Sequence, residues 1–437
     1  MKRVVVTGIG VVSPLGNSFY ESWMAAKAGL SGILPITRFD VSDMRWKVAG
    51  ELKGFDAGKY LSQKERNRVD PFVHYAVAAA TMAVEDAGLI PPTHPSPLRG
   101  EGKGEGENPE LRSASGGSNS EFLNSAGVII GSSRGGISTM ERELKKSFDY
   151  RLMTRSPKVS AYLMPSTTIS MASSYVSQKL GIKGYCLGIS NACASGTSAI
   201  GEAYRLIRSG YRGIVLCGGA EAPVCRICIE GYGSSGALSK INDSSASRPF
   251  DRTRDGFVLS EGACILVLEN HETALKRGVE MYGEIIGYGN TTDAFHQTIP
   301  ASEGETRAIK TAIDEAGLKP EDIDFINAHG TSTPLGDKTE TEAIKLSFGG
   351  RAYCIPVSSI KSMTGHMLAA SGAIEAAFTL MSMREGVITP TINLKERDPE
   401  CDLDYVTETK RADIKFAISN SFGFGGVNAV LVFSIPP

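Results

Sequence analysis

The chain has 437 residues, 22% of them charged, and a formal net charge of −2. This charge argues against a nucleic-acid-binding surface that relies on bulk positive charge, and no apolar run reaches the roughly 20 residues that span a bilayer. The length suffices for one large core or two domains, and the eight scattered cysteines fit a reducing compartment. The chain opens directly into a strand pattern at residues 3–6, so we expect a cytoplasmic protein without a signal peptide.

Strands and helices alternate along the chain, which is typical of an α/β fold with buried sheets. Asp70 and Pro71 predict the N-cap and the first turn of a helix that runs to about Ala87 and is closed by Gly88. This helix carries almost no charge, which predicts that it is buried. Further strands are predicted at 185–189, 214–217, 263–268 and 429–435.

The segment from residue 91 to about 125 differs in composition from the rest of the chain. It is rich in Pro, Gly, Glu, Ser and Asn and has few apolar side chains. Such a composition cannot bury enough apolar surface to offset the entropy lost on ordering. We predict a flexible surface insertion, and a partner-binding loop is the alternative because long loops are sometimes functional.

Cys193 lies between the apolar run 185–189 and a helical pattern over 195–209. This order predicts a strand, a tight turn and a helix, with the thiol at the turn. The positive end of the helix dipole favours a thiolate, so we expect a lowered thiol pKa. From these residues alone, a catalytic nucleophile and a buried structural thiol are both open.

Two histidines also follow predicted strands. His329 comes after the short apolar run 325–328 and before a Gly/Thr/Ser turn, and His366 follows a second strand and a turn that contains Lys361. The chain has only six histidines. One cysteine and two histidines at strand ends are therefore better explained by a shared site than by chance.

Two other motifs are too incomplete to indicate a function. Cys225 and Cys228 have C-x-x-C spacing, but no second pair completes a zinc site, so we interpret them as ordinary thiols. Gly8 and Gly10 begin a glycine pattern that lacks the third glycine and the acidic partner of a dinucleotide site.

Four runs of the sequence resemble the signatures of β-ketoacyl-[acyl carrier protein] synthases, most closely the elongating synthase II type. They are Asn-Ala-Cys-Ala-Ser-Gly at 191–196, His-Gly-Thr-Ser-Thr at 329–333, Lys-Ser-Met-Thr-Gly-His at 361–366 and Asn-Ser-Phe-Gly-Phe-Gly-Gly-Val-Asn at 420–428. The resemblance covers nearly the whole chain except the segment near residue 100.

The resemblance implies a thiolase-like α/β fold, with two similar α/β halves in a five-layered αβαβα arrangement. A weak internal repeat fits this, because Ala-Ser-Gly at 194–196 recurs at 370–372, each time near the start of an Ala/Gly-rich helix. We expect residues 1–270 to form the half with the nucleophile, and residues 271–437 to form the half with both histidines.

The resemblance also implies the catalytic roles. Cys193 is the acylated nucleophile, and His329 and His366 bind the malonyl thioester carbonyl and stabilise the enolate. Lys361 orders the site and holds His366 in the useful tautomer. The backbone N–H groups of Cys193 and Phe424 form the oxyanion hole, and Phe424 acts as a gate.

Further residues receive supporting roles from the resemblance. The hydroxyls of Thr331 and Thr333 suit the amides of a phosphopantetheine arm, although a structural turn explains them equally well. The remaining implied positions are Arg134 and Phe422 at the substrate, Asp337 and Glu340 as acids that organise the site, Lys64, Arg68 and Lys158 at the carrier-protein surface, and Asn327, Glu375, Ser419 and Asn420 around a structural monovalent cation.

Two residues depart from the family pattern. Arg134 stands in a glycine-rich loop where the family carries a glycine or a small apolar residue beside the acyl tunnel. A buried unpaired arginine would cost several kcal/mol, so we expect it to pair with an acid, to turn away, or to shorten the tunnel and favour short or polar acyl groups. Gly236 stands where a relative has an arginine, which weakens the expected basic docking patch.

The implied activity is the decarboxylative Claisen condensation of fatty acid elongation. An acyl group on Cys193 reacts with malonyl-acyl carrier protein to give β-ketoacyl-acyl carrier protein, CO2 and free carrier. The expected partners are acyl carrier protein and a second copy of the chain, with no nucleic acid or membrane. No metal or organic cofactor is expected, because both substrates arrive on carrier-protein phosphopantetheine.

Several alternatives are weighed against this function. A polyketide or specialised-lipid ketosynthase uses the same residues and stays open, as does a non-catalytic partner subunit, although such subunits typically lose the nucleophile. A thiolase would need a second cysteine in the run 420–428, which has none. A chain-initiating synthase would pair the cysteine with histidine and asparagine, and Lys361 with His366 argues against it.

Overall fold

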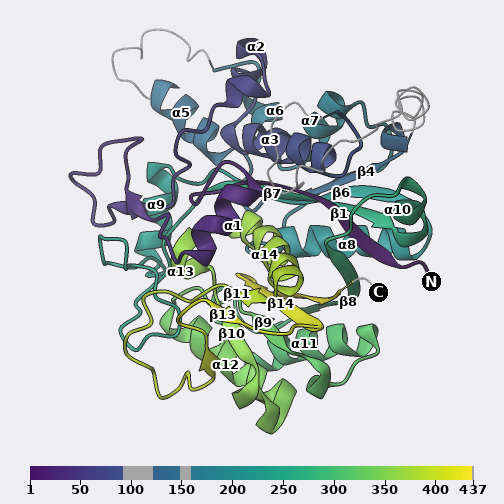
Figure 1. Ribbon diagram of the computed structural model, residues 1–437. Coiled ribbons are helices and arrows are strands. Elements are labelled where there is room, and N and C mark those ends of the chain that lie inside the picture. The colour runs from purple at the N-terminus through teal and green to yellow at the C-terminus, as the bar shows by residue number, and fades with distance from the viewer. Residues whose placement is uncertain (92–121, 148–158, 436–437) are drawn as a thin grey trace.

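The computed structural model describes residues 1–91, 122–147 and 159–435, and most of the predicted insertion at 91–125 lies outside the described residues. Within the described ranges, no helix combines the length and the apolar character needed to cross a membrane. The architecture is built from one large mixed sheet and the helices that cover it (Figure 1).

Eleven strands form this sheet in the order β12-β10-β9-β14-β15-β8-β1-β7-β6-β4-β5. The half built mainly from the N-terminal part of the chain contains β1 (Val4–Val12), β4 (Gly127–Gly131), β5 (Cys186–Ile189), β6 (Ile214–Glu221) and β7 (Gly262–Asn270). The other half contains β8 (Gly283–Thr292), β9 (Phe325–Asn327), β10 (Pro356–Ser358), β12 (Asp404–Tyr405), β14 (Phe416–Gly423) and β15 (Val427–Ser434).

The strand pairing repeats in the two halves. Outward from β1, the neighbours β7 and β6 pair antiparallel, and β4 and β5 pair parallel. Outward from β8, the neighbours β15 and β14 pair antiparallel, and β9 and β10 pair parallel. The halves join where β1 meets β8 through the pairs Val4–Ile285, Val5–Glu284 and Val6–Gly283.

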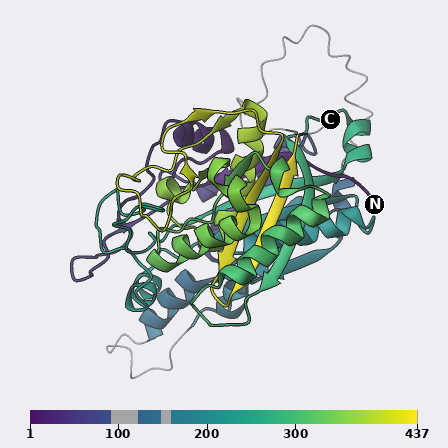
Figure 2. The ribbon, with the colours of Figure 1, turned by 90° about the horizontal axis from the view of Figure 1, so that it is seen from below.

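The two halves of the sheet form two layers and the helices form three more, which gives the five layers that were predicted. Helix α3 (Pro71–Asp86) packs on β1 and β7, with α7 (Met171–Leu180) beside it. The central layer consists of α8 (Ser195–Arg208) and α14 (Ser371–Glu385), which contact each other and both halves of the sheet. On the far side, α11 (Ser302–Ala316) and α12 (Pro334–Phe348) cover the C-terminal strands, as Figure 2 shows in green over yellow.

Shorter elements surround these layers. The helices are α1 (Phe19–Lys27), α2 (Gln63–Arg66), α5 (Ile137–Ser147), α6 (Leu163–Thr167), α9 (Arg226–Ser234), α10 (His271–Arg277) and α13 (Lys361–Thr364). Two small two-stranded sheets pair β2 (Leu34–Pro35) with β3 (Val48–Ala49), and β11 (Val387–Ile388) with β13 (Lys410–Arg411).

The helix predicted after Asp70 is confirmed. The side chain of Asp70 accepts a hydrogen bond from the backbone N–H of Phe72, Pro71 occupies the first turn, and Gly88 follows with a φ of +65°. Most of its side chains are buried, because one face covers the sheet and another meets α7. The predicted strands are also confirmed, with ends shifted by a few residues.

The internal repeat corresponds to the two central helices. Ser195 is the first residue of α8 and Ser371 is the first residue of α14. Their starts touch: a Cβ atom on Gly196 would lie 2.3 Å from the carbonyl oxygen of Ala369, and one on Gly372 would lie 2.0 Å from Oγ1 of Thr197. The glycines of the repeat therefore allow the helices to meet at the centre of the molecule.

Candidate active site

Cys193 lies in the turn between β5 and α8, as predicted. The preceding residue, Ala192, has a φ of +46°, a left-handed conformation that is uncommon for a residue with a side chain. Ser195 stabilises this turn: its Oγ accepts from the backbone N–H of Asn191 at 2.8 Å and donates to the carbonyl of Ala192 at 2.6 Å. The turn holds the thiol 9% exposed, at the wall of a cavity.

The loop after β14 lies against this turn. A Cβ atom on Gly423 would be 3.3 Å from the backbone nitrogen of Cys193, so glycine permits the close approach. Gly425 and Gly426 have φ values of +88° and +69°, which shape the loop. The backbone of Phe424 forms a hydrogen bond to the Cys193 thiol, and the ring of Phe424 is 36% exposed at the cavity.

The two histidines meet beside the thiol. His329 follows β9, His366 follows α13, and their ring centroids are 5.5 Å apart at an interplanar angle of 86°. The edge-to-face series continues from His366 to Phe257 at 5.2 Å and from His329 to Phe422 at 5.9 Å. These ring contacts bury both imidazoles and limit their rotation.

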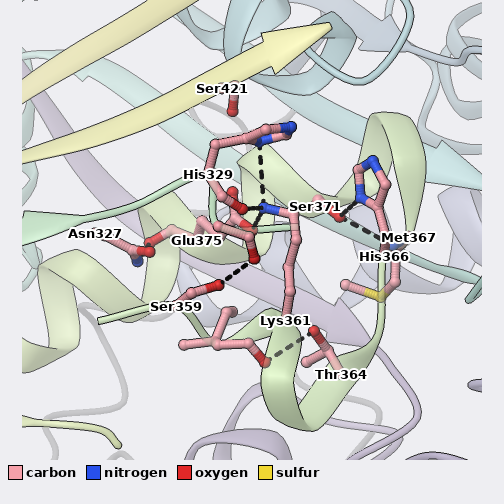
Figure 3. Close-up of polar contacts among 12 residues, drawn as sticks. Asn327, His329, Ser359, Lys361, Thr364, His366, Met367, Ser371, Glu375 and Ser421 are labelled. Atoms are coloured by element: carbon pink, nitrogen blue, oxygen red, sulfur yellow. Dashed lines mark hydrogen bonds and ion pairs between the residues drawn. The ribbon is translucent and has the colours of Figure 1, made fainter. Parts of the chain in front are cut away.

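A different neighbour orients each imidazole (Figure 3). Nζ of Lys361 lies 3.3 Å from Nδ1 of His329 and donates to the His329 carbonyl at 2.5 Å. Oγ of Ser371 lies 3.1 Å from Nδ1 of His366 and accepts from the backbone N–H of Met367. The prediction that Lys361 holds His366 is wrong: Lys361 holds His329, and Ser371 holds His366.

These contacts assign the tautomers. An ammonium has only donors, so Nδ1 of His329 accepts and a neutral ring carries its proton on Nε2. The hydroxyl of Ser371 accepts from the backbone N–H of Met367 and has one proton of its own. When it donates that proton to Nδ1 of His366, the neutral ring of His366 also carries its proton on Nε2. Both Nε2–H groups are thereby hydrogen-bond donors.

The electrostatics keep the histidines neutral. Burial is the main cause that holds the pKa of His329 well below its usual range, and Lys361 and His366 lower it further. Burial and then Lys361 lower the pKa of His366 in the same way. Neutral imidazoles therefore prevail at neutral pH.

The expected low pKa of the nucleophile is corrected by the structure. Burial raises the pKa of the Cys193 thiol to about 11. The Lys361 ammonium, the backbone of Phe424 and the Arg134 guanidinium each lower it, but they do not outweigh the desolvation. The free thiol is protonated at neutral pH.

Lys361 also forms a buried ion pair with Oε1 of Glu375 on α14, and each side chain is only 1% exposed. Burial raises the pKa of Glu375 to about 7, and Lys361 opposes this rise. The other carboxylate oxygen, Oε2, is buried without a hydrogen-bond partner among the described residues. The same holds, within the described part of the chain, for Oδ1 of Asn327, Oγ of Ser419 and Oδ1 of Asn420.

Two acids on α12 organise the backbone around His329. The carboxylate of Glu340 accepts from the N–H groups of His329 at 2.8 Å and Gly330 at 2.7 Å. The carboxylate of Asp337 accepts from the N–H groups of Ser332 and Phe250 at 3.0 and 2.8 Å. Burial raises the pKa of Asp337 to about 7, although Arg254 lowers it from 3.5 Å away.

These groups surround a cavity of about 440 Å³. Thr331 and Thr333 face it with their hydroxyls 3.0 Å apart, while Thr333 also caps α12 by accepting from the N–H of Gly336. Binding of a phosphopantetheine arm and stabilisation of a turn, the two roles expected for these threonines, are therefore compatible with each other. The predicted site residues that line the cavity are Cys193, His329, Thr331, Thr333, Glu340, His366, Phe422 and Phe424.

Other predicted site residues lie outside the lining. Lys361 and Asp337 are buried behind it. Lys64 is exposed on α2, and the guanidinium of Arg68 lies 4.7 Å from the ring centre of Tyr162. Lys158 lies outside the described residues.

Arg134 is exposed and lies outside the cavity lining, which matches the second of its three expected outcomes, turning away. Its Nε donates to the hydroxyl of Tyr232 at 2.8 Å, and its guanidinium carbon lies 5.2 Å from that ring centre. Tyr232 lines the cavity with Cys193. The arginine thus pairs with a phenol rather than with an acid of the described chain.

Three further residues of the site, Ser371, Tyr232 and Asp293, were not predicted from the sequence. Asp293 holds the Phe424 loop: it accepts from Asn428 Nδ2 at 2.6 Å, and its own N–H donates to Gly426. Only the position of Ser371 gave a usable signal, because it is the first residue of α14 and follows His366 by five residues. Cys225 and Cys228 form no disulfide.

Comparisons with known proteins match almost the whole chain. The model for "Beta-ketoacyl synthase, N-terminal domain" matches residues 1–274, and that for "Beta-ketoacyl synthase, C-terminal domain" matches residues 282–395. A "3-oxoacyl-[acyl-carrier-protein] synthase 2" from Synechocystis sp. is 45% identical, over 99% of this chain and 98% of the relative.

Solved ketosynthase structures are also similar to this chain in fold. The "ishigamide ketosynthase/chain length factor" superposes with a TM-score of 0.87 at 35% identity, covering 100% of both chains. A type II PKS acyl-carrier protein in complex with its ketosynthase bound to the hexaketide gives a TM-score of 0.85 at 31% identity, again covering 100% of both chains.

Proposed function

This chain belongs to the β-ketoacyl synthase family, and we propose that it catalyses the chain-elongating condensation of fatty acid synthesis. It joins an acyl group held on Cys193 to malonyl-acyl carrier protein and forms β-ketoacyl-acyl carrier protein, CO2 and free carrier. The observation that carries this proposal is the meeting of one thiol and two donor imidazoles at a single cavity.

The first half-reaction is acyl transfer to Cys193. The sulfur attacks the thioester carbonyl of the acyl carrier, the new carbon–sulfur bond forms, and the old one breaks. Because the thiol is protonated at neutral pH, its proton leaves with the departing phosphopantetheine thiol. The backbone N–H groups of Cys193 and Phe424 stabilise the tetrahedral oxyanion, since fixed donors need no reorganisation.

The second half-reaction makes the carbon nucleophile. The Nε2–H groups of His329 and His366 donate to the malonyl thioester oxygen, which accepts electron density as the carboxylate leaves as CO2. The enolate carbon attacks the acyl-cysteine carbonyl, and the Cys193 thiolate departs and takes a proton from solvent. Loss of CO2 supplies the electron pair, so this chemistry needs neither a metal nor an organic cofactor.

Other residues support these steps. Lys361 and Ser371 hold the two tautomers, and Asp337 and Glu340 fix the backbone that carries His329. The hydroxyls of Thr331 and Thr333 bind the amides of the phosphopantetheine arm. Phe424 gates the cavity beside Phe422, an assignment supported by its glycine-rich loop and its partly exposed ring.

We assign a structural monovalent cation to the oxygens of Asn327, Glu375, Ser419 and Asn420. Support comes from four buried oxygens, one on each residue, that have no hydrogen-bond partner in the described part of the chain. A cation there would supply the electrostatic partner that these four oxygens lack, beside the ion pair of Glu375 with Lys361. The melting temperature should be higher in KCl or NaCl than in choline chloride of equal ionic strength, and Ser419→Ala should reduce this difference.

Acyl carrier protein is the proposed partner, in a homodimer located in the cytoplasm. Lys64, Arg68 and Lys158 are the proposed docking cations, which would steer an acidic carrier. The homodimer is supported by β5, which ends the sheet with Cys186 exposed and Leu187 and Ile189 only half-buried.

We divide the chain at residue 270, where β7 ends and the chain turns toward β8.

Intact-mass analysis tests the reaction directly. The protein is incubated with acyl carrier proteins of several chain lengths, and malonyl carrier protein is then added. An acyl adduct should form, require Cys193 and disappear as β-ketoacyl product accumulates. Cys193→Ala should form no adduct, whereas Cys354→Ala, which removes an exposed thiol, should behave as wild type. Absence of any adduct on the folded wild-type protein would contradict the proposal.

A polyketide or specialised-lipid ketosynthase is the second candidate, favoured by Arg134 beside the nucleophile's cavity. The same assay separates the candidates, because housekeeping elongation predicts transfer of long unsubstituted acyl groups. A non-catalytic partner subunit is disfavoured, because Cys193 is present at the cavity.

A further inference from the structure

The C-x-x-C pair of the sequence, Cys225 and Cys228, lies at the start of helix α9. Cys225 is the N-cap, and its carbonyl accepts the backbone N–H of Ile229 at 3.1 Å, so Cys228 is the third residue of the helix. The side chains of the N-cap and of the third helical residue lie on the same side of the first turn. The spacing that is incomplete for a zinc site therefore places two thiols side by side.

The two thiols are close enough to interact. The neighbouring Cys228 thiol, even more than burial, raises the pKa of Cys225. Both residues belong to one hydrophobic cluster, and each is 7% exposed. In helix geometry, Cα atoms three residues apart are separated by about 5 Å, within the range of about 4.4–6.8 Å that a disulfide bridges. A bond between the two sulfurs therefore needs little movement of the backbone.

A carboxylate adjoins the pair. Oε2 of Glu141, on helix α5, accepts the backbone N–H of Ile227 at 2.7 Å and so holds the first turn of α9. Burial would raise the pKa of Glu141, but this N–H, Lys145 and the Cys225 thiol hold it below its usual value. Glu141 thus fixes the turn that carries both thiols and offers an acceptor to the S–H of Cys225 as that sulfur reacts.

The surroundings favour redox chemistry over metal binding. A metal would need a third ligand, and in the described part of the chain no group of three or more His, Cys, Asp or Glu side chains could hold an ion. A second pair, Cys217 on β6 and Cys264 on β7, is fully buried, and Cys217 lies opposite Leu266. These two cysteines are diagonal neighbours, about 7–8 Å apart, which is too far for a disulfide. An external reagent can reach and close only the pair of Cys225 and Cys228.

We propose that Cys225 and Cys228 are a redox-active dithiol, which small-molecule disulfides convert reversibly into an intramolecular disulfide. One thiol attacks the reagent, forms a mixed disulfide and releases a first small thiol. The other thiol attacks the protein sulfur of the mixed disulfide, closes the bond and releases a second small thiol. The protein loses two electrons, the reagent gains them, and both thiol protons leave on the released thiols. Disulfides of this kind in a reducing compartment are typically transient and redox-sensing.

Oxidised glutathione, added to the full-length protein, tests the site. After acid quenching, the remaining thiols are blocked with N-ethylmaleimide and located by pepsin digestion and mass spectrometry. The peptide with Cys225 and Cys228 should lose two hydrogens, bind no maleimide and recover both thiols in dithiothreitol. Half-oxidation should need about tenfold less oxidised glutathione than half-glutathionylation of the exposed Cys354, because ring closure is intramolecular. Cys217 and Cys264 should stay reduced.

Single variants separate ring closure from the reactivity of one thiol. Cys225→Ser keeps a good N-cap, and Cys228→Ala keeps a good helix former, so both should fold. Neither variant should lose two hydrogens, although the remaining thiol can bind glutathione. Cys354→Ala is the matched control and should form the disulfide as the wild type does.

Two results would overturn the inference. One is glutathionylation of Cys354 in the wild type while Cys225 and Cys228 still bind maleimide. The other is a loss of two hydrogens that persists in both single variants, because it would place the disulfide elsewhere. The thiol state is measured without an acyl donor, so neither result depends on the proposed condensing activity.

Discussion

At the scale of single residues, the site depends on one orienting partner for each imidazole. We predict that Ser371→Ala lowers the rate of malonyl decarboxylation about tenfold or more, because His366 loses the donor that fixes its tautomer. Cys193 acylation should be unaffected, since it does not require that imidazole. Ser371→Thr should restore the rate by keeping the hydroxyl. Equal loss in both half-reactions would indicate a structural role instead.

The ion pair of Lys361 and Glu375 should control stability. Lys361→Met leaves a carboxylate uncompensated in the interior, and we expect it to lower the free energy of unfolding by about 3–5 kcal/mol. The double variant Lys361→Met/Glu375→Gln removes the charge as well and should recover much of this loss. Urea denaturation of the wild type, of the single variants Lys361→Met and Glu375→Gln and of the double variant measures the effect, and additive losses would argue against coupling between the two side chains.

The thiol should behave as a weak acid. Because burial raises the pKa of Cys193 to about 11, the thiolate fraction rises about tenfold per pH unit throughout the neutral and mildly alkaline range. Iodoacetamide labelling of Cys193, followed by peptide mass spectrometry, should therefore keep accelerating above pH 9. A reference peptide with one cysteine should reach about half of its maximal rate near pH 8.5 and level off above that pH. A plateau for Cys193 near pH 7 would contradict the effect of burial.

At the scale of elements, the catalytic geometry depends on the contact of two turns. A Cβ atom on Gly423 would lie only 3.0 Å from the carbonyl oxygen of Asn191 and 3.3 Å from the nitrogen of Cys193. We predict that Gly423→Ala displaces the Phe424 loop and slows acyl transfer about 100-fold, the order of loss when one oxyanion donor is removed.

Gly231→Ala provides the matched control for this substitution. It lies on helix α9, and nothing stands within 4 Å of its added Cβ atom. Circular dichroism should show both variants folded, and only Gly423→Ala should lose activity. Wild-type transfer rates in Gly423→Ala would separate the loop contact from catalysis.

At the scale of the whole molecule, the two halves share their interior. The β1–β8 pairing joins the sheets, and one hydrophobic cluster contains Val4 and Ile200 together with Tyr288, Phe378 and Leu431. Exposing either half would therefore expose much of the common core.

We predict a single cooperative unfolding transition, lowered but not split by Gly372→Ala. The new Cβ atom would meet Oγ1 of Thr197 at 2.0 Å and so separate the central helices. Overpacking of this kind costs about 1–3 kcal/mol. Scanning calorimetry measures the transition, with Gly231→Ala again as the control. Two resolved transitions in the wild type would show that the halves unfold independently.

The elements were largely predictable because their signals are local. A cap at Asp70, a proline in the first turn and a closing Gly88 act through neighbouring atoms, so α3 was predicted nearly to its ends. The Ala-Ser-Gly repeat likewise marked the starts of α8 and α14. Strand ends were less certain, because pairing with distant strands decides where a strand stops.

The sequence by itself determined the class of fold, the family resemblance and the chemical groups of the site, because these depend on residue type and spacing. Only the tertiary structure decided how the groups act. Lys361 orients His329 rather than His366, Ser371 takes the second place, and burial keeps Cys193 protonated. Hydrogen-bond partners and desolvation depend on chain segments far apart in sequence, and folding alone brings those segments together.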